Sequence, residues 1–355
     1  MIRKRLVGAM AGILAMTFAL GACSGQEPEP VVVTQTPAAD PDRVHPPEPV
    51  APDPIVWPLT GVPVEEVAAR PALGIKIENS RQSRPQTGLE QADIVWEQIT
   101  EGGVTRFVAI YHSQIPEAVL PVRSARAVDA PIMAPLGGLL AFSGAQPQFI
   151  GAIEGNGVQA VVMDRGNGGF TRERSRRAPH NVRGNPQAFL DQATSDRQSP
   201  PPAQFRHALE AGQGTATVTG TELARLTVKF SPYQTVVWDW DAASGTFLRS
   251  EGGKAAVSAA GTRLSARNVV LLEVDQVPSP WRDPAGSPVP EQVIVGSGSG
   301  LVAGGGRYVP ITWSKDSEGA PMVLTGADGQ EVELEQGSTW LQLASPNAGS
   351  SWSIG

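Results

Sequence analysis

The first half of the chain contains short runs in which nearly every position is apolar. Gly, Pro and polar residues bound these runs, which lie at residues 73–78, 93–99, 104–112, 138–144 and 158–163. Continuous apolar runs of this length are typical of β-strands that are covered on both faces. Helices are expected at 124–136, where two prolines interrupt the pattern, at 146–155 and at 185–194. Strands that alternate with helices predict an α/β layer.

The second half has a different pattern. Residues 195–220 are rich in Ser, Pro, Gln, Gly and Ala and favour a boundary. Short strands separated by turn residues follow, at 225–230, 234–241, 245–250, 267–275, 291–300, 307–314, 321–326, 331–337 and 339–345. This pattern predicts a mostly antiparallel β domain, with a barrel and a sandwich both open. The glycine-rich stretch at 296–300 is interpreted as turn material.

Together these patterns predict an α+β protein, with an α/β sandwich-like domain followed by a mostly antiparallel β domain. The expected boundaries are a signal peptide at 1–23, a tether at 24–56, the first domain at 57–195, a linker at 196–220, the second domain at 221–346 and a tail at 347–355.

The N-terminus has the features of a bacterial lipoprotein signal. Three basic residues precede an uncharged apolar segment, and Leu20-Gly21-Ala22-Cys23 reads as a lipobox. A plain transmembrane anchor is the alternative, but the apolar segment is short for one. Cys23 is therefore the expected site of lipidation, with palmitate, at the extracytoplasmic face of the cell membrane.

The amino-acid composition narrows the classes of molecule that the protein is expected to bind. The net charge is -7, which makes a nucleic-acid partner unlikely by charge alone. With a single cysteine, the chain forms no internal disulfide. Residues 24–56 hold nine prolines and few large apolar side chains, a composition that predicts an unfolded tether.

Polar residues with potential chemistry concentrate in the first domain. Arginine side chains bind carboxylates and phosphates through two parallel hydrogen bonds, and free N–H groups of glycine turns add to an anion site. The proposed ligand-binding residues are Arg106, Arg123, Arg126, Arg177, His180 and Asn181. Glu78, Glu97 and Glu101 could orient the arginines or act as acid or base.

A structural interpretation competes with this hypothesis. Glu97 and Arg106 could form a cross-strand ion pair, and the arginines at 172–177 could belong to a solvated loop. No metal site is expected, because His and Cys lack ligand spacing, and no nucleotide or nucleophile motif is present. No cofactor is expected.

The quoted motifs point to one family. "WPLTGVPVEE" at 57–66, the whole of residues 70–129 and "SRRAPHNV" at 175–182 closely resemble the YerB-like bacterial lipoproteins. These envelope proteins carry the domain of unknown function 3048. The C-terminal part, through "LSARNVVLLEV" and "GQEVELEQGSTWLQL", is similar more loosely. The resemblance implies a two-domain lipoprotein without an established activity.

The leading hypothesis is a module that binds an anionic envelope ligand, either a glycan or a lipid-linked phosphate. One alternative is an enzyme of cell-wall polymer assembly, because "VLPVRSAR" at 119–126 is similar in outline to LytR-CpsA-Psr phosphotransferases. The other is a scaffold that binds another envelope protein. The sequence leaves open whether any reaction is catalysed.

Overall fold

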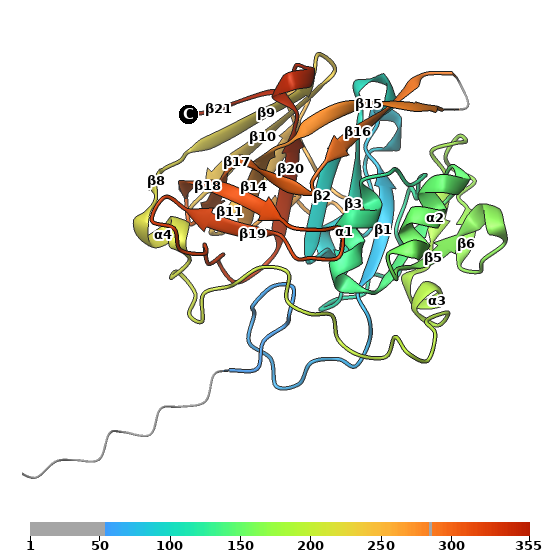
Figure 1. Ribbon diagram of the computed structural model, residues 1–355, viewed down its shortest axis with the longest axis horizontal. Helices are drawn as coiled ribbons and strands as arrows, with labels where there is room; N and C mark the ends of the chain where they lie inside the picture. Colours follow the sequence, from blue (N-terminus) through green and yellow to red (C-terminus); the bar gives the residue numbers. More distant parts are fainter. Residues whose placement is uncertain (1–53, 284–285) are drawn as a thin grey trace, which may run out of the picture. The chain divides into compact units, whose positions relative to one another are not determined.

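The structure, a computed structural model, describes residues 54–283 and 286–355. Cys23 and most of the predicted tether lie outside these residues. Strands far outnumber helices in the described part, in agreement with the coarse α+β class (Figure 1). No helix of residues 54–283 or 286–355 is long and apolar enough to cross a membrane.

One large sheet runs through both halves of the chain. Its first half supplies β1 (Leu73–Glu78), β2 (Ile94–Ile99), β3 (Thr105–Tyr111), β4 (Leu139–Phe142) and β5 (Gln159–Val162). The second half supplies β8 (Thr221–Glu222), β14 (Asn268–Glu273), β17 (Gly296–Gly304), β18 (Arg307–Lys315), β19 (Val323–Gly326) and β20 (Thr339–Ala344). The order is β19-β18-β17-β14-β20-β2-β3-β1-β4-β5, and β8 pairs with β18.

Strand β20 joins the two halves. It pairs in parallel with β2 on one side and with β14 on the other, so that Trp340 is the register partner of both Val95 and Val269. These strands carry apolar side chains on both faces, and both faces are buried. The sheet is thus continuous across the expected boundary at 196–220, and the division into two domains stays a prediction.

Helices cover one face of this sheet. On this face lie α1 (Asp129–Met133) and α2 (Pro147–Gly155), whose Met133 and Ile153 pack in the same core cluster as Val108 and Leu140. The 124–136 pattern yields only this short α-helix, followed by a 3-10 turn at Ala134–Leu136. The remaining helices are α3 (Pro186–Leu190) and α4 (Thr215–Thr219), with 3-10 turns at Arg81–Ser83, Leu89–Gln91, Glu101–Gly103, Met163–Arg165 and Pro346–Ala348.

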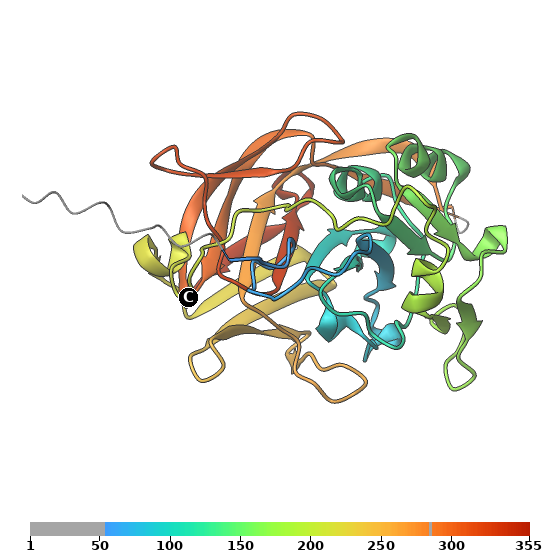
Figure 2. The same ribbon diagram turned by 90° about the horizontal axis from the view of Figure 1, so that it is seen from below.

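A second sheet covers part of the other face (Figure 2). It consists of β9 (Arg225–Ser231), β10 (Gln234–Asp241), β11 (Thr246–Glu251), β12 (Lys254–Ala255), β13 (Ser265–Ala266) and β21 (Ser351–Ile354). Trp340 lies edge-on between Phe107 and Trp238 in the core between the sheets. Two ribbons complete the fold: β6 (Phe170–Arg172) with β7 (Val182–Gly184), and β15 (Asp275–Arg282) with β16 (Pro288–Val293).

Three local predictions were wrong. Residues 296–300 belong to strand β17, where Gly300 lies so near the Leu271 carbonyl that a Cβ would approach its oxygen to 2.1 Å. Residues 331–337 form no named strand. The tail at 347–355 contains β21, which pairs with β9 and extends the second sheet.

Candidate functional site

The candidate residues gather where β1 ends and β2 turns into β3. Because strand side chains alternate between faces, this end of the sheet presents polar groups on both sides. The face that carries α1 holds Lys76, Glu78, Gln98 and Arg106, and the face toward the second sheet holds Asn79, Glu97 and Thr105. The predicted cluster is therefore divided into two networks by the sheet.

Glu101 is the centre of the first network. Arg126 donates to it through Nε at 2.5 Å and Nη2 at 2.6 Å, and Arg106 Nη2 lies 3.7 Å away. Arg106 also donates to the carbonyl oxygen of Ser124 at 2.8 Å. Burial disfavours ionised Glu101, but the hydrogen bonds and charge of Arg126 outweigh it and lower the pKa of Glu101. Burial and the neighbouring Arg126 lower the pKa of Arg106 to about 9.

Glu78 connects two further predicted residues. His180 Nδ1 lies 2.8 Å from its Oε1, and Arg123 Nε lies 3.4 Å from its Oε2. Ser80 donates to Oε1 at 2.8 Å. The side chains of Arg123 and His180 are each 23% exposed, in contrast to the 5% of Glu78. Arg123 and His180 thus retain access to solvent, whereas Arg126 is engaged in a near-buried bidentate pair.

A buried ion pair that the sequence analysis missed supports these residues. Lys76 Nζ and Asp129 Oδ1 are 2.7 Å apart and fully buried. Asp129 also accepts from Gln98 Nε2 at 2.6 Å and from the Arg126 backbone N–H at 2.7 Å. Burial lowers the pKa of Lys76 to about 8 although Asp129 opposes the shift. The sequence signal that could have revealed this ion pair is the charged Lys76 within the buried run "LGIKIE".

The second network contradicts the expected Glu97–Arg106 pair. In the β2–β3 register Gln98 lies opposite Arg106, and Glu97 lies opposite Phe107 on the other face. Glu97 instead binds Arg249 of β11, with Oε2 2.8 Å from Nη1 and Oε1 2.9 Å from Nη2. Burial raises the pKa of Glu97, against the opposing charge of Arg249.

A carboxylate and three aromatic rings contact the guanidinium of Arg249. Its Nε donates to Glu251 at 2.7 Å, and its guanidinium carbon lies 4.9–5.2 Å from the ring centres of Phe107, Trp238 and Trp340. Stacking on aromatic faces suits the weakly hydrated guanidinium of arginine. This network is a structural link between the two halves of the chain and is closed to a large ligand.

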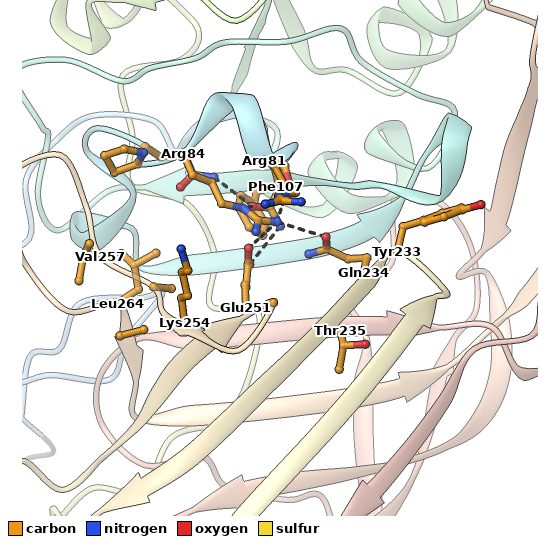
Figure 3. A pocket seen from close by; sticks show the side chains of 16 residues that line it. Arg81, Arg84, Phe107, Tyr233, Gln234, Thr235, Glu251, Lys254, Val257 and Leu264 are labelled. Carbon is orange, nitrogen blue, oxygen red and sulfur yellow. Dashed lines mark hydrogen bonds and ion pairs between the residues drawn. The ribbon is translucent and has the colours of Figure 1, made fainter.

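Two cavities open beside the loop at residues 79–86. The first, which we call the Tyr233 cavity, has a volume of about 550 Å³ and is shown in Figure 3. Residues from both halves of the chain line it, among them Arg81, Arg84, Tyr233, Gln234, Glu251 and Lys254. Arg84 donates to Asn79. It also donates to Gln234 and pairs with Glu251 at 2.5 Å, and dashed lines in Figure 3 mark these two contacts.

The second cavity, which we call the arginine cavity, has a volume of about 630 Å³. Its lining consists of Gln82, Arg84, Pro85, Ser175, Arg176, Arg177, Ala178 and His180. Arg176 donates to the Ser83 carbonyl at 2.7 Å, whereas the exposed side chain of Arg177 contacts no partner in the described chain. None of these lining residues is acidic, so the cavity is basic within an acidic protein.

The structure thus separates the predicted residues. Arg177 and His180 line the arginine cavity, and Arg123 lies behind His180 through Glu78. Asn181 is buried beside this cavity and accepts a hydrogen bond from Arg172 at 2.9 Å. Sequence reasoning missed Arg81, Arg84, Tyr233, Gln234 and Lys254, because only the tertiary fold brings the β9–β10 turn and β12 to the loop at 79–86.

Comparison with known proteins shows what the chain is similar to. "Putative lipoprotein YerB" of Bacillus subtilis (strain 168) is 51% identical over 70 residues, which is 19% of this chain and about a fifth (21%) of that relative. The crystal structure of the YerB protein from Bacillus subtilis aligns with a TM-score of 0.71 at 24% identity, covering 84% of this chain and 99% of that one. At that identity the second likeness shows the fold alone.

Two family models match the chain. Residues 59–199 match the N-terminal domain of the protein family of unknown function DUF3048, and residues 226–341 match its C-terminal domain. Together the two matches include both ion-pair networks and all the residues that line the two cavities. The chain therefore belongs to the DUF3048 family of proteins.

Proposed function

We propose that this protein is a lipid-anchored lipoprotein of the cell envelope that binds an anionic ligand in the arginine cavity. The lipobox at Cys23 and the name of the Bacillus subtilis relative support the anchor. The ligand class is a phosphate-bearing glycan or a lipid-linked phosphate at the extracytoplasmic face of the membrane.

One observation carries the binding proposal. Three arginines and a histidine line one cavity that has no acidic lining residue, in a protein of net charge -7. Guanidinium groups bind phosphate bidentately, and the unpaired side chain of Arg177 has this capacity free. A cavity of about 630 Å³ accommodates a group of the size of a sugar phosphate.

The predicted residues take different parts in this proposal. Arg177 and His180 contact the ligand, and Arg84 and Arg176, whose guanidinium groups already donate to other residues, add positive charge to the cavity wall. Glu78 orients His180 and Arg123 from behind the cavity. Arg106 and Arg126, which Glu101 already engages, hold the turn that follows β2 rather than the ligand.

The test measures binding of inorganic pyrophosphate by calorimetry. Arg177→Ala is expected to weaken binding about 10- to 100-fold, because it removes one charge-assisted contact, and to leave the melting temperature unchanged. Arg206→Ala is the matched control, since Arg206 is an exposed arginine that pairs with Glu333 and lines neither cavity. Equal affinities of Arg177→Ala and wild type, or no binding by wild type, would refute the proposal.

A further inference from the structure

The Tyr233 cavity differs in chemistry from the arginine cavity. Its lining combines apolar side chains, such as Phe107 and Leu264, with amides and a carboxylate. The only cations at its exposed edge are Arg81 and Lys254, because Arg84 is occupied by Asn79, Gln234 and Glu251. A mixed apolar and hydrogen-bonding surface fits a polar uncharged group better than it fits a phosphate.

Gln234 supplies an unused donor in this cavity. Its side chain is 5% exposed, and its Oε1 accepts a hydrogen bond from Arg84 Nη2 at 3.2 Å. This contact fixes the orientation of the amide, because guanidinium groups only donate. Nε2 is therefore the free end, and it has no hydrogen-bond partner among the described residues. A buried donor without a partner is costly, and a ligand that reaches Gln234 in the cavity wall would relieve this cost by accepting from Nε2.

Tyr233 supplies an aromatic surface at the same cavity. Tyr233 lies in the turn between β9 and β10 and is 81% exposed, the highest value among the large hydrophobic side chains of the described chain. Figure 3 shows it at the rim, with Gln234 and Glu251 farther in. An exposed aromatic face and an amide donor match the apolar ring face and the oxygen atoms of a carbohydrate.

We propose that the Tyr233 cavity is a carbohydrate subsite. The inference rests on the proposed function in one respect: Arg84 and Pro85 line both cavities, so a single ligand can extend from one to the other. The ligand is then a glycosyl phosphate, with its sugar in the Tyr233 cavity and its phosphate in the arginine cavity. Gln234 Nε2 donates to a sugar oxygen, and the exposed ring of Tyr233 packs on the sugar.

The test uses neutral and charged probes separately. Chitotetraose and maltotetraose probe the sugar subsite, and inorganic pyrophosphate probes the arginine cavity. Tyr233→Ala is expected to weaken binding of the preferred oligosaccharide about 3- to 10-fold and to leave pyrophosphate affinity unchanged. Gln234→Glu, which keeps the acceptor for Arg84 and replaces the free donor, is expected to weaken oligosaccharide binding by a similar factor.

Two controls make the result specific. Trp281→Ala removes another exposed aromatic residue, which lines neither cavity, and should bind both probes like wild type. Thermal melts establish that Tyr233→Ala and Gln234→Glu are folded; should Gln234→Glu fail to fold, Tyr233→Ala alone decides. Wild type that binds neither oligosaccharide, or variants that bind them unchanged, would overturn the subsite. Arg177→Ala is assayed with pyrophosphate, whereas the variants of the Tyr233 cavity are assayed with oligosaccharides. Either proposal can therefore fail while the other stands.

Discussion

The guanidinium of Arg249 and the carboxylate of Glu97 form a fully buried ion pair between residues 152 positions apart in the chain. Glu97 lies in the part that matches the N-terminal family domain, and Arg249 in the part that matches the C-terminal one. A buried charge without its partner is strongly unfavourable. The N-terminal part therefore depends on the C-terminal one to neutralise Glu97 in the shared core.

Removal of Arg249 should be severely destabilising. Arg249→Met strands Glu97 and leaves Glu251 with Arg84 as its remaining cationic partner, and the expected loss is about 3–5 kcal/mol. Urea unfolding followed by tryptophan fluorescence measures this loss. In the double variant Arg249→Met/Glu97→Gln the loss should be smaller than the sum of the single losses. Additive losses would show that the pair is not coupled.

Arg126 and Arg123 should respond differently to replacement by alanine. Arg126→Ala removes the bidentate partner of the 7% exposed Glu101, leaves it only the longer contact with Arg106, and is expected to cost about 3 kcal/mol. Arg123→Ala removes a longer contact at a 23% exposed side chain and should cost about 0–1 kcal/mol. Arg126→Lys, which keeps the charge but loses the bidentate geometry, should fall between wild type and Arg126→Ala. Thermal melts test this order, and equal stability of the two alanine variants would contradict it.

Acidification should destabilise the protein in part through His207. Burial lowers the pKa of His207 to about 4, outweighing a hydrogen bond with the backbone of Phe205. Because the folded pKa lies below the unfolded value near 6.5, the unfolded state binds more protons between pH 6.5 and 4. Stability is therefore lost as the pH falls through this window, by about 2 kcal/mol between pH 7 and pH 5. Other groups titrate in the same window, so the quantity to measure is the difference between wild type and His207→Gln, which should lose about 2 kcal/mol less. Parallel stability curves would exclude the effect.

Limited proteolysis should cut the chain into fragments that stay associated. Residues 192–214 contain no helix or strand, and trypsin is expected to cut after Arg197 in this segment. The pairing of β20 with β2 and the ion pair between Glu97 and Arg249 span the cut. The fragments should therefore migrate separately on a denaturing gel and together on gel filtration. Fragments that elute separately would support two autonomous domains.

Cys23→Ala tests the anchor. Cys23 lies outside the described residues, and the expectation rests on its place in the lipobox. The variant should lack lipid modification and either remain unprocessed or be released from the membrane. Membrane fractionation and mass spectrometry of the mature N-terminus measure both. A variant that is processed and retained like wild type would contradict lipidation at Cys23.

The strands could be predicted from the sequence more completely than their pairing. Runs such as "LGIKIE" carry a local apolar pattern, and β1 was expected at the bounds it has. Pairing of β20 with β2 depends on contacts between distant segments, which no local pattern encodes. The candidate site shows the same limit: Arg177 and His180 lie close in sequence and were proposed together, but Tyr233 and Gln234 join the loop at 79–86 only through the fold.

The position of β20 has a consequence for biogenesis. Until residues 339–344 have been synthesised, β2 and β14 each lack a neighbour, because β20 fills the place between them. Exposed strand edges are templates for wrong pairing, and contacts of long sequence separation form slowly. The nascent chain should therefore require a chaperone that shields these edges. A chain that terminates before β20 should aggregate or be degraded.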